Sequence, residues 1–429
     1  MVAMPEDIKP EFPKKFLWGA STSAHQVEGG NHNQWTVWEL ANAAQMAQSA
    51  QKRMGHMPIW PDIKKQAQDP DNYVSGKGVD HFRRYEEDFD LAKSLNLKAL
   101  RFGVEWSRIE PEEGGWNEEA IEHYREYIKQ LKKRGIEPVM NIWHTTMPVW
   151  FCDKGAFKYR SNLKYFERFV QKLAEEYASQ LKWVITLNEP NVYATYGYLV
   201  DEPLSGPWPP GEKNALSFAR VCWNLIQAHR KAYKILKAAN PALQVGLASQ
   251  LANIQAKRPH NELDELTTKV MRYFWNWWFL RRVRLEMDFV GFNYYFTDYY
   301  TELGKRKDPQ LPLSDMGWYM EPEGLYPLLL SVWRHYKKIP IIVTENGVAD
   351  AKDEYRRWWI EESIVAMERA ISEGVDIRGY FYWSLLDNFE WANGWWPKFG
   401  LIEVDREHGM KRTTRESAKW LAEKIKKLS

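Results

Sequence analysis

Two glutamates, each at the end of a short apolar run, are the residues best placed to do chemistry in this chain. Glu189 follows the run 183–187 and then Asn188, and Glu345 follows the run 340–344. Runs rich in β-branched residues that end in polar and turn residues are typical of buried parallel strands entering a loop. Carboxylates at the carboxyl ends of such strands lie where parallel α/β folds keep their active sites. Two of them, each beside an asparagine, suggest the paired carboxylates of glycoside hydrolysis.

The elements that must position these glutamates alternate regularly along the chain. We predict strands at residues 16–20, 99–104, 137–143, 183–187, 245–249, 289–292, 340–344 and 379–383. Amphipathic stretches with helical spacing lie at residues 79–95, 117–134, 162–181, 215–239, 322–337 and 353–373. Eight strands alternating with helices predict an α/β fold, a single (β/α)8 TIM barrel with catalytic loops at its C-terminal face. A doubly wound parallel sheet is the alternative.

The length of 429 residues fits one barrel with insertions, so we expect a single domain over residues 1–429. Residues 41–79 contain Met, Gln, Ala and Pro without a clear period, and we expect a long irregular loop there, after the first strand. The chain also holds 23 Trp, 22 Tyr and 18 Phe. Aromatic faces can stack on sugar rings, although any single Trp is more often a core residue.

Hydrogen-bonding side chains follow the predicted strands. In chain order they are Gln26 and Glu28, Arg101, Glu105 and Trp106, Asn141 and His144, Asn188 and Glu189, Asn293 and Tyr295, Glu345, and Trp383, Glu390 and Trp391. Each one alone has a structural explanation, because Asn and Asp commonly end strands and Glu commonly caps helices. Gathered at one rim of a barrel, they indicate a polyhydroxylated ligand or a catalytic site.

Three motifs resemble glycoside hydrolase family 1, the β-glucosidase and β-galactosidase family. They are Thr-Leu-Asn-Glu-Pro at 186–190, Thr-Glu-Asn-Gly at 344–347 and Tyr-Trp-Ser-Leu-Leu-Asp-Asn-Phe-Glu-Trp at 382–391. The resemblance runs from residue 12 to residue 413 and includes residues 16–20, 105–108, 291–295 and 316–319. It implies a (β/α)8 barrel with the acid/base after strand 4 and the nucleophile after strand 7. The strand count above puts Glu189 and Glu345 at those two positions.

The resemblance also implies a role for each matching residue. Glu345 would be the nucleophile, with Arg101 and Tyr295 keeping it ionised, and Asn293 would join this catalytic set. Glu189 would be the general acid and then the base, with its pKa raised by burial and by Glu345. Substrate binding would fall to Gln26, His144, Asn188, Trp383, Glu390, Trp391, Trp318 and Phe399. Asn188 would bind the 2-hydroxyl, Trp383 would stack on the sugar, and His144 has a purely structural alternative. Candidates for the outer wall of the binding site, on the acceptor side, are Trp150, Trp318, Trp395 and Trp396.

The implied reaction is retaining exo-hydrolysis of terminal β-D-glucosyl residues, and also of β-galactosyl or β-fucosyl residues, through a covalent glycosyl-enzyme intermediate. Retention requires carboxyl groups ~5–5.5 Å apart. Family members that cleave 6-phosphosugars have Ser where this chain has Glu390, and Lys and Tyr where it has Pro397 and Phe399. We therefore expect unphosphorylated β-glycosides or short β-linked oligosaccharides as substrates. The alternatives are a transglycosidase and a non-catalytic sugar-binding barrel.

Two departures from the family pattern affect these expectations. The family usually has His-Trp after strand 3, whereas this chain reads His144-Thr145-Thr146. The missing indole affects sugar preference and affinity rather than catalysis. The stretch between Leu280 and Asp288 is much shorter than in the family, so we expect a reduced helical layer there. That flank would be either more open or a subunit contact.

Composition excludes several other classes of protein. A net charge of +2, from 59 basic and 57 acidic residues, gives no reason to expect nucleic acid or an anionic membrane as a partner. The ten histidines lack ligand spacing and the cysteines are two, so we expect no metal, no cofactor and no disulfide framework. Residues 1–15 contain no apolar leader and no run is long enough to span a membrane. We therefore expect a cytoplasmic monomer or homo-oligomer.

Overall fold

The computed structural model describes residues 11–202, 204, 206–306, 310–336 and 339–428. Eight parallel strands form a closed barrel, in the order β1, β11, β10, β7, β5, β4, β3, β2. Their bounds are β1 Leu17–Ser21, β2 Ala99–Gly103, β3 Glu137–Trp143, β4 Trp183–Asn188, β5 Gln244–Gln250, β7 Phe289–Tyr294, β10 Ile341–Asn346 and β11 Ile377–Trp383. The predicted TIM barrel is confirmed, and each predicted strand end is within two residues of the observed one. The doubly wound alternative is wrong, because its sheet would have two open edges.

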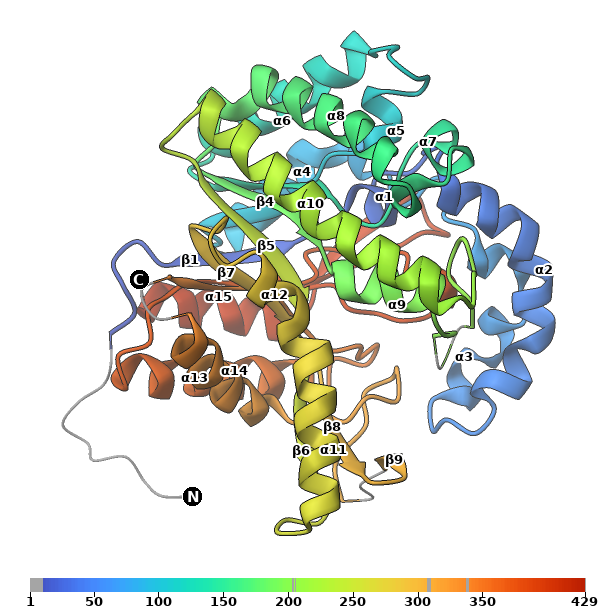
Figure 1. The fold of residues 1–429 in the computed structure, drawn as a ribbon, viewed down its shortest axis with the longest axis vertical. Helices are drawn as coiled ribbons and strands as arrows, with labels where there is room; N and C mark the ends of the chain where they lie inside the picture. The colour runs from blue at the N-terminus through green and yellow to red at the C-terminus, as the bar shows by residue number, and fades with distance from the viewer. Residues whose placement is uncertain (1–10, 203, 205, 307–309, 337–338, 429) are drawn as a thin grey trace.

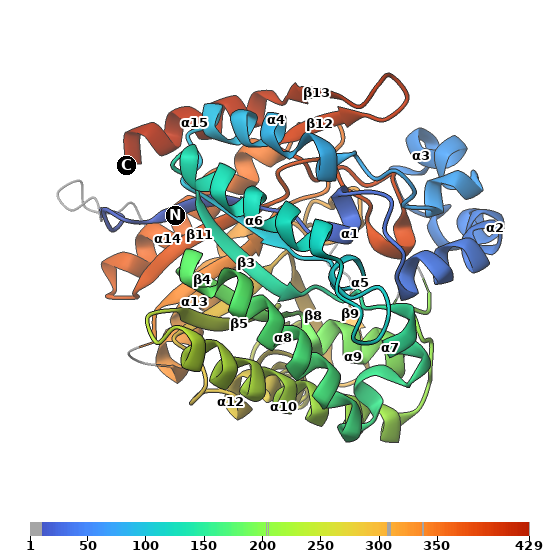
Figure 2. The ribbon, with the colours of Figure 1, turned by 90° about the horizontal axis from the view of Figure 1, so that it is seen from above.

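Helices surround the barrel, as Figure 2 shows from above. All of the predicted amphipathic stretches form helices, namely α4 His81–Ser94, α6 Glu118–Lys133, α8 Leu163–Tyr177, α10 Ala215–Ala239, α13 Leu325–His335 and α14 Arg356–Ser372. The end of the fifth stretch, Lys337, lies outside the described residues, as do residues 1–10 of the predicted leaderless terminus. Further α-helices include α1 Ala24–Val27, α5 Trp106–Ile109, α7 Val149–Asp153, α9 Pro190–Tyr198, α12 Trp278–Arg282 and α15 Glu416–Leu428. In the described residues no helix is both long and apolar enough to cross a membrane.

The prediction of an irregular loop over residues 41–79 is wrong. Most of that segment is helical, in α2 (Gln34–Met54), α3 (Trp60–Ala67) and the short 3-10 helix η1 (Pro70–Tyr73). In Figure 1, α2 and α3 stand to the right of the barrel strands. Asn33 starts α2, since its side chain accepts hydrogen bonds from the first backbone amides of the helix. The buried face of α2 consists largely of Ala and Met, which give a weak apolar period among the Gln residues.

The amino-terminal half of the barrel interior is filled by apolar side chains. One buried cluster takes members from all eight strands: Leu17, Ala99, Val139, Trp183, Ile185, Ala248, Phe289, Ile342 and Phe381. A packed floor of this kind is typical of the TIM barrel, whose interior is a core and not a pore. Further along the same strands, the inward positions are polar. The barrel interior therefore has an apolar layer, which stabilises the fold, and a polar layer further along the strands, where a reaction can take place.

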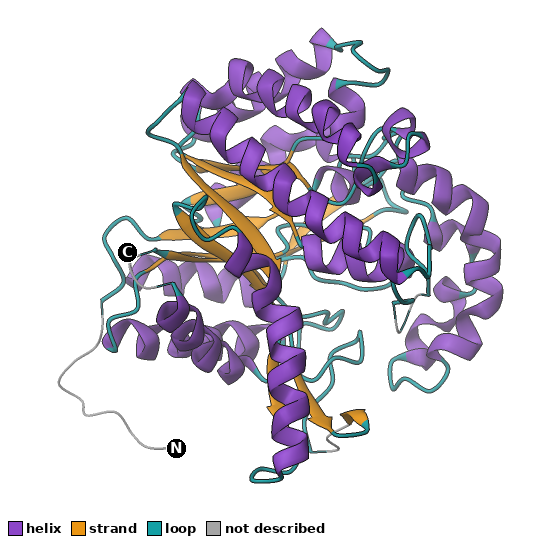
Figure 3. Cartoon of the chain, in the orientation of Figure 1, coloured by secondary structure: helices purple, strands orange, loops and turns teal. Residues whose placement is uncertain are grey.

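Two small sheets lie outside the barrel; Figure 3 shows one of them below the barrel strands, and the strands of the other are labelled in Figure 2. One is the antiparallel pair β12 (Ile402–Asp405) and β13 (Lys411–Thr414), and the other has the order β6-β8-β9. The second sheet consists of β6 Asn253–Ala256, β8 Thr297–Thr301 and β9 Gly304–Arg306. Helix α11 (Glu262–Arg272) packs on it and continues through a π-helical turn into α12. Because α12 has only five residues before the chain enters β7, the reduced helical layer predicted there is confirmed.

Candidate active site

A bulge near the end of β10 turns Glu345 into the barrel. Val343 pairs with Phe292 of β7, and Glu345 pairs with the very next β7 residue, Asn293. Two residues of β10 thus stand against one of β7, which changes the face to which the following side chains point. Ile342 lies in the barrel interior. Strict alternation from Ile342 would have turned the Glu345 side chain outward.

A similar bulge in β4 lies just before Asn188. Ile185 pairs with Gly246 of β5, and Asn188 pairs with Ala248, so three steps along β4 match two along β5. The next residue, Glu189, has φ +47° and ψ +51° and directly precedes α9. This left-handed backbone is uncommon for a residue with a side chain, and such conformations concentrate at functional sites. The two bulges bring both predicted glutamate regions to one rim.

Glu345 is buried among donors that stabilise its negative charge. Arg101 Nη1 donates to Glu345 Oε1, and the Tyr295 hydroxyl donates to Glu345 Oε2 at 2.5 Å. The second Nη of Arg101 donates to Asn188 Oδ1 at 2.6 Å. Burial, together with the Glu345 charge, holds the pKa of Tyr295 well above its usual value, so this hydroxyl keeps its proton. A buried carboxylate needs such a guanidinium and hydroxyl to remain charged.

Glu189 has a contrasting environment. Its Oε1 accepts one hydrogen bond, from Asn293 Nδ2 at 2.8 Å. No ion pair of Glu189 with Arg, Lys or His is found among the described residues. Burial and the negative charge of Glu345 raise the pKa of Glu189 to about 8. At neutral pH this side chain therefore carries a proton that it can give to a ligand.

Sugar-binding candidates continue the same rim. The His144 ring stacks against Trp383 and Trp391, with ring centroids 5.9 and 6.0 Å away and planes inclined by 30° and 29°. Burial and nearby Arg101 hold the pKa of His144 well below its usual value, so the ring is neutral. Its Nε2 lies 3.0 Å from Asn188 Nδ2. His144 is thus part of the site's hydrogen-bond network as well as of its aromatic wall.

Gln26 and Glu390 form a second polar pair. Gln26 Nε2 donates to the Phe389 carbonyl at 2.7 Å and lies 3.4 Å from Glu390 Oε2, which also accepts from Asn388 at 2.9 Å. Burial, with the Glu345 charge adding to it, raises the pKa of Glu390 to about 8. Glu390 thus carries a proton at neutral pH and can both donate to and accept from a hydroxyl.

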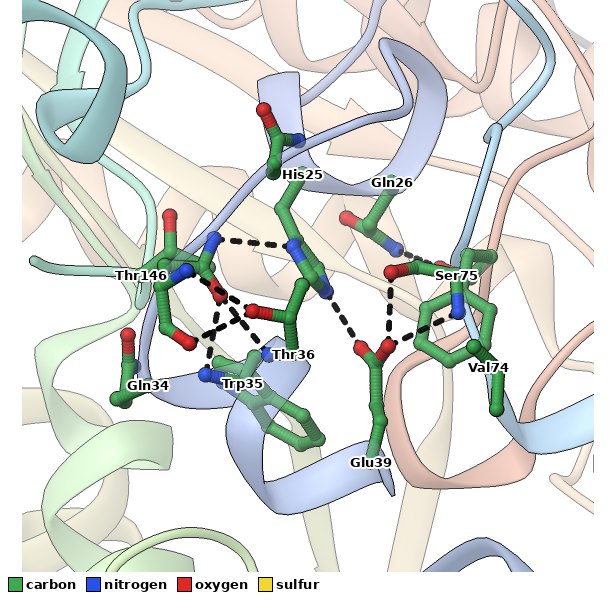
Figure 4. A network of polar contacts seen from close by, with 12 residues as sticks. His25, Gln26, Gln34, Trp35, Thr36, Glu39, Val74, Ser75 and Thr146 are labelled. Atoms are coloured by element: carbon green, nitrogen blue, oxygen red, sulfur yellow. Dashed lines mark hydrogen bonds and ion pairs between the residues drawn. The ribbon is translucent and has the colours of Figure 1, made fainter. Parts of the chain in front are cut away.

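The segment that carries Gln26 is held in place by α2, as Figure 4 shows. The ring of His25 lies 3.1 Å from Asn33 Nδ2 and 2.8 Å from Glu39 Oε1. The other oxygen of Glu39 accepts from the backbone and the hydroxyl of Ser75. This buried network ties α1 to α2 and to the segment after η1. Ser75, in the segment predicted as a loop, therefore helps to hold Glu39 and, through it, the neighbour of Gln26.

These residues surround a cavity of about 560 Å³. The predicted residues that line it are His144, Glu189, Tyr295, Trp318, Glu345, Trp383, Glu390, Trp391 and Phe399. The other four predicted residues, Gln26, Arg101, Asn188 and Asn293, do not line it but bond to residues that do. One cavity with convergent carboxylates, amides and stacked aromatic rings fits a sugar. In the described residues, no group of three or more His, Cys, Asp and Glu side chains could hold a metal ion.

Comparison with known proteins identifies the family. The model of "Glycosyl hydrolase family 1" matches residues 8–285 and 280–428. The chain belongs to this family. Beta-glucosidase A of Acetivibrio thermocellus is 28% identical over 469 aligned positions, covering 97% of this chain and 99% of that protein. The beta-galactosidase of Sulfolobus acidocaldarius is 31% identical, covering 92% and 91%. A solved structure, the beta-glycosidase from Pyrococcus horikoshii, has a TM-score of 0.84 at 33% identity and covers 97% of this chain and 95% of that one.

Membership in family 1 makes this chain a glycoside hydrolase with β-glycosidase activity. The two matched segments meet at residues 280–285, the place where the chain is shortened. At the other departure, Thr145 is buried with φ +73°. In its neighbourhood Trp391 packs against two further indoles, Trp35 and Trp208, at centroid distances of 5.0 and 5.7 Å. Of these indoles, Trp208 and Trp391 line the cavity, whereas Trp35 does not.

Several residues of the family 1 cavity were not predicted from the sequence. They include Arg53, His56, Met57 and Pro58 near α2, Tyr196 and Trp208 after β4, Trp275 before α12, and Asp298, Lys305 and Arg306 on β8 and β9. The residues near α2 were not predicted to line the cavity because that segment was predicted to be an irregular loop. Conversely, Trp150, Trp395 and Trp396 do not line the cavity, so they are wrong as outer-wall candidates. Trp150 instead packs edge-on against Trp106 and Tyr165.

Proposed function

We propose that this chain is a retaining exo-β-glycosidase. Its substrates would be β-glycosides or short β-linked oligosaccharides that end in an unphosphorylated β-D-glucosyl, β-galactosyl or β-fucosyl residue. The observation that carries the proposal is the contrast between the two carboxyls. Glu345 is bonded to a guanidinium and a phenol, whereas burial and charge repulsion raise the pKa of Glu189 to about 8. Two carboxyl groups in such different environments take different roles: the one bonded to a cation is the nucleophile, and the one that keeps its proton is the acid.

In the first half-reaction, Glu345 attacks the anomeric carbon while Glu189 protonates the departing glycosidic oxygen. The bond from the anomeric carbon to the aglycone breaks, and an ester bond to Glu345 forms. Asn188 accepts from Arg101 and Asn293, which fixes its amide beside Glu345. We assign Asn188 to the 2-hydroxyl, a contact that strengthens as positive charge develops on the sugar ring.

In the second half-reaction, water replaces the aglycone. Once Glu345 is esterified it has no charge, so one of the causes that raise the pKa of Glu189 disappears. Glu189, now ionised, takes a proton from water, and the resulting hydroxide oxygen attacks the anomeric carbon and releases Glu345. Two displacements at one carbon return the original β-configuration.

The proposed preference for an unphosphorylated sugar rests on the charges around Glu390. Among the described residues that line the cavity, the cations Arg53, Lys305 and Arg306 come from α2 and β9, not from the loop that carries Glu390. Lys398 is close in sequence but does not line the cavity. A phosphate placed beside Glu390 would gain no cation from that loop, so the site disfavours it.

The experiment that tests this proposal compares hydrolysis of nitrophenyl β-glucoside, β-galactoside, β-fucoside and β-mannoside by the native protein and by Glu345→Gly. We expect turnover of the first three by the native protein and loss of turnover in the variant. A folded native protein that binds these glycosides without cleaving them would favour the sugar-binding alternative. Release of nitrophenol with most of the sugar transferred to an added alcohol, in place of water, would favour a transglycosidase.

A further inference from the structure

We propose that Gln34 is a positioning residue for His144, which it holds in the site by fixing the turn at residues 145–147. This role rests on the proposed function, in which His144 contacts the sugar. Gln34 is the first residue of α2, where Figure 4 labels it. Its side chain is buried and does not line the cavity. Gln34 therefore acts on a ligand only through the residues that it holds.

Three hydrogen bonds join Gln34 to this turn. Its Nε2 donates to the carbonyl of Thr145 at 2.8 Å, and its Oε1 accepts from the backbone N–H of Met147 at 2.7 Å. Its own backbone N–H, which has no partner within α2 because it lies in the first turn, donates to the carbonyl of Met147 at 3.2 Å. The side-chain amide thus bonds to the backbone on both sides of Thr146.

The backbone of Thr145 needs such support. Its φ of +73° is uncommon for any residue with a side chain and is unfavourable for a β-branched one. Conformations of this kind persist only where the surrounding structure imposes them. Gln34 supplies that constraint, because it bonds to the carbonyl of Thr145 and to the N–H two residues later. Without Gln34, Thr145 would return to a negative φ and would displace the preceding residue, His144.

A second residue holds the side chain of Thr146. The hydroxyl of Thr146 donates to Oε2 of the buried Glu105 at 2.9 Å. The other carboxylate oxygen of Glu105 accepts from the hydroxyl of Ser107 at 2.8 Å. Glu105 therefore fixes a side chain of the turn, whereas Gln34 bonds to its backbone. Control over the left-handed conformation of Thr145 belongs to Gln34.

The position of His144 matters for two contacts with the sugar. Its ring stacks against Trp383 and Trp391, and its Nε2 lies 3.0 Å from Asn188 Nδ2. Asn188 is the residue that we assign to the 2-hydroxyl. A displaced His144 would therefore disturb the contact made by Asn188 as well as its own, and small displacements in an active site reduce the rate strongly.

The test is a double-mutant cycle between Gln34 and His144. Gln34→Met keeps an unbranched side chain but removes both hydrogen-bonding groups of the amide, so kcat/KM for nitrophenyl β-glucoside should fall by about 10–100-fold. In the His144→Ala background, the same change should reduce kcat/KM further by less than about twofold, because residues that act through one another are not additive. Gln48→Met, at an exposed position on the same helix, is the matched control and should keep the native kcat/KM.

A further substitution tests the backbone of the turn. Glycine adopts a positive φ as readily as a negative one, so adding Thr145→Gly to Gln34→Met should restore kcat/KM to within about threefold of Thr145→Gly alone. Amide hydrogen exchange in the peptide that contains Met147 should be faster in Gln34→Met than in the native protein and in Gln48→Met. This second readout needs no turnover.

Native kcat/KM in Gln34→Met, an equal loss with and without His144, or no restoration by Thr145→Gly would overturn the positioning role. Failure of the proposed function gives a different result, a native protein that binds the iminosugar deoxynojirimycin but cleaves no glycoside. The same cycle is then measured on the Kd of deoxynojirimycin, by calorimetry. A loss of affinity in Gln34→Met that disappears in His144→Ala would support the positioning role, and an equal loss in both backgrounds would overturn it.

Discussion

Arg101 links Glu345 to Asn188: one Nη of its guanidinium donates to Glu345 and the other donates to Asn188 at 2.6 Å. The three residues come from three different strands, β2, β10 and β4. A single rigid side chain thus fixes the proposed nucleophile relative to the proposed contact for the 2-hydroxyl. Displacing it would disturb both the charge and the geometry of the site.

Replacing Arg101 with Met should therefore reduce kcat by about a thousandfold or more, because Glu345 loses its cation. It should also lower the free energy of unfolding by about 3–5 kcal/mol, since a buried carboxylate remains without its partner. Both effects are measured by steady-state kinetics and by urea unfolding. Arg125→Met, at a partly exposed guanidinium that pairs with Glu122 and Glu176, is the control and should change both quantities much less. Near-native kcat in Arg101→Met would contradict this role.

The pH dependence of kcat/KM should follow Glu189. Its proton is needed in the first half-reaction, and its folded-state pKa is raised to about 8, so activity should fall as pH rises through about 8. Glu390 has a pKa raised to a similar value and could contribute to the same decline. Glu189→Gln distinguishes the two, because it should remove the decline caused by Glu189. The same decline in Glu189→Gln as in the native enzyme would assign it to another group.

Glu189→Gln should also discriminate between leaving groups. Poor leaving groups such as alkoxides need the proton, so kcat/KM for alkyl glucosides should fall by about 10³–10⁴-fold. Nitrophenolate leaves without a proton, so the rate of the first step on nitrophenyl glucosides should fall much less. Pre-steady-state release of nitrophenol measures this step directly. An equal loss on both substrates would mean that Glu189 is not the acid.

Glu390→Gln tests recognition of the sugar. The carboxyl accepts from Asn388 and lies near Gln26, and the amide keeps its shape but removes one acceptor. We expect kcat/KM for the glucoside to fall by about 10–100-fold, from the loss of about 1.5–3 kcal/mol of hydrogen bonding in the transition state. Thermal unfolding should change little by comparison. Unchanged kcat/KM on every sugar would remove Glu390 from the binding residues.

Stability towards acid should depend on a buried cluster far from Glu345 in sequence. Burial would raise the pKa of Asp88, but hydrogen bonds from His81 and Arg412 hold it below its usual value. The stabilisation is therefore complete above the unfolded-state pKa of about 3.9 and is lost as pH falls through the lower folded-state pKa. Asp88→Asn should lower the free energy of unfolding at pH 7 by about 3–5 kcal/mol and flatten its fall below about pH 4. A variant as stable as the native protein at pH 7 would contradict this.

The sequence allowed the barrel to be predicted because its strands are buried on both faces and read as uninterrupted apolar runs. The strand at Glu137–Trp143 was predicted to the residue. Helix α2 was not predicted, since Ala47 and Ala50 carry little apolar signal among polar neighbours. The bulges in β4 and β10 could not be predicted either, because an apolar run shows no alternation of polar and apolar residues whose interruption would mark a bulge.

Some residues around the cavity could be predicted from the sequence, and others could not. Glu189, Glu345 and the side chains that touch them could be predicted, because they follow strand ends within long motifs. Arg53, Lys305 and Arg306 reach the cavity from α2 and β9, elements whose positions depend on tertiary packing. The substitution of Thr145 was evident in the sequence, but the packing of Trp208 against Trp391 was not. Residues far from the strand ends need the folded structure to be placed.

The most direct test of the proposed mechanism is to trap the intermediate on the nucleophile. An activated 2-fluoro glucoside forms the ester quickly but releases it slowly, so mass spectrometry of the digested enzyme can locate the sugar. The proposal predicts one fluoroglucosyl group, on the peptide that contains Glu345, and β-glucose as the first product from the normal substrate. A label on Glu189 or Glu390, or α-glucose as the first product, would contradict it.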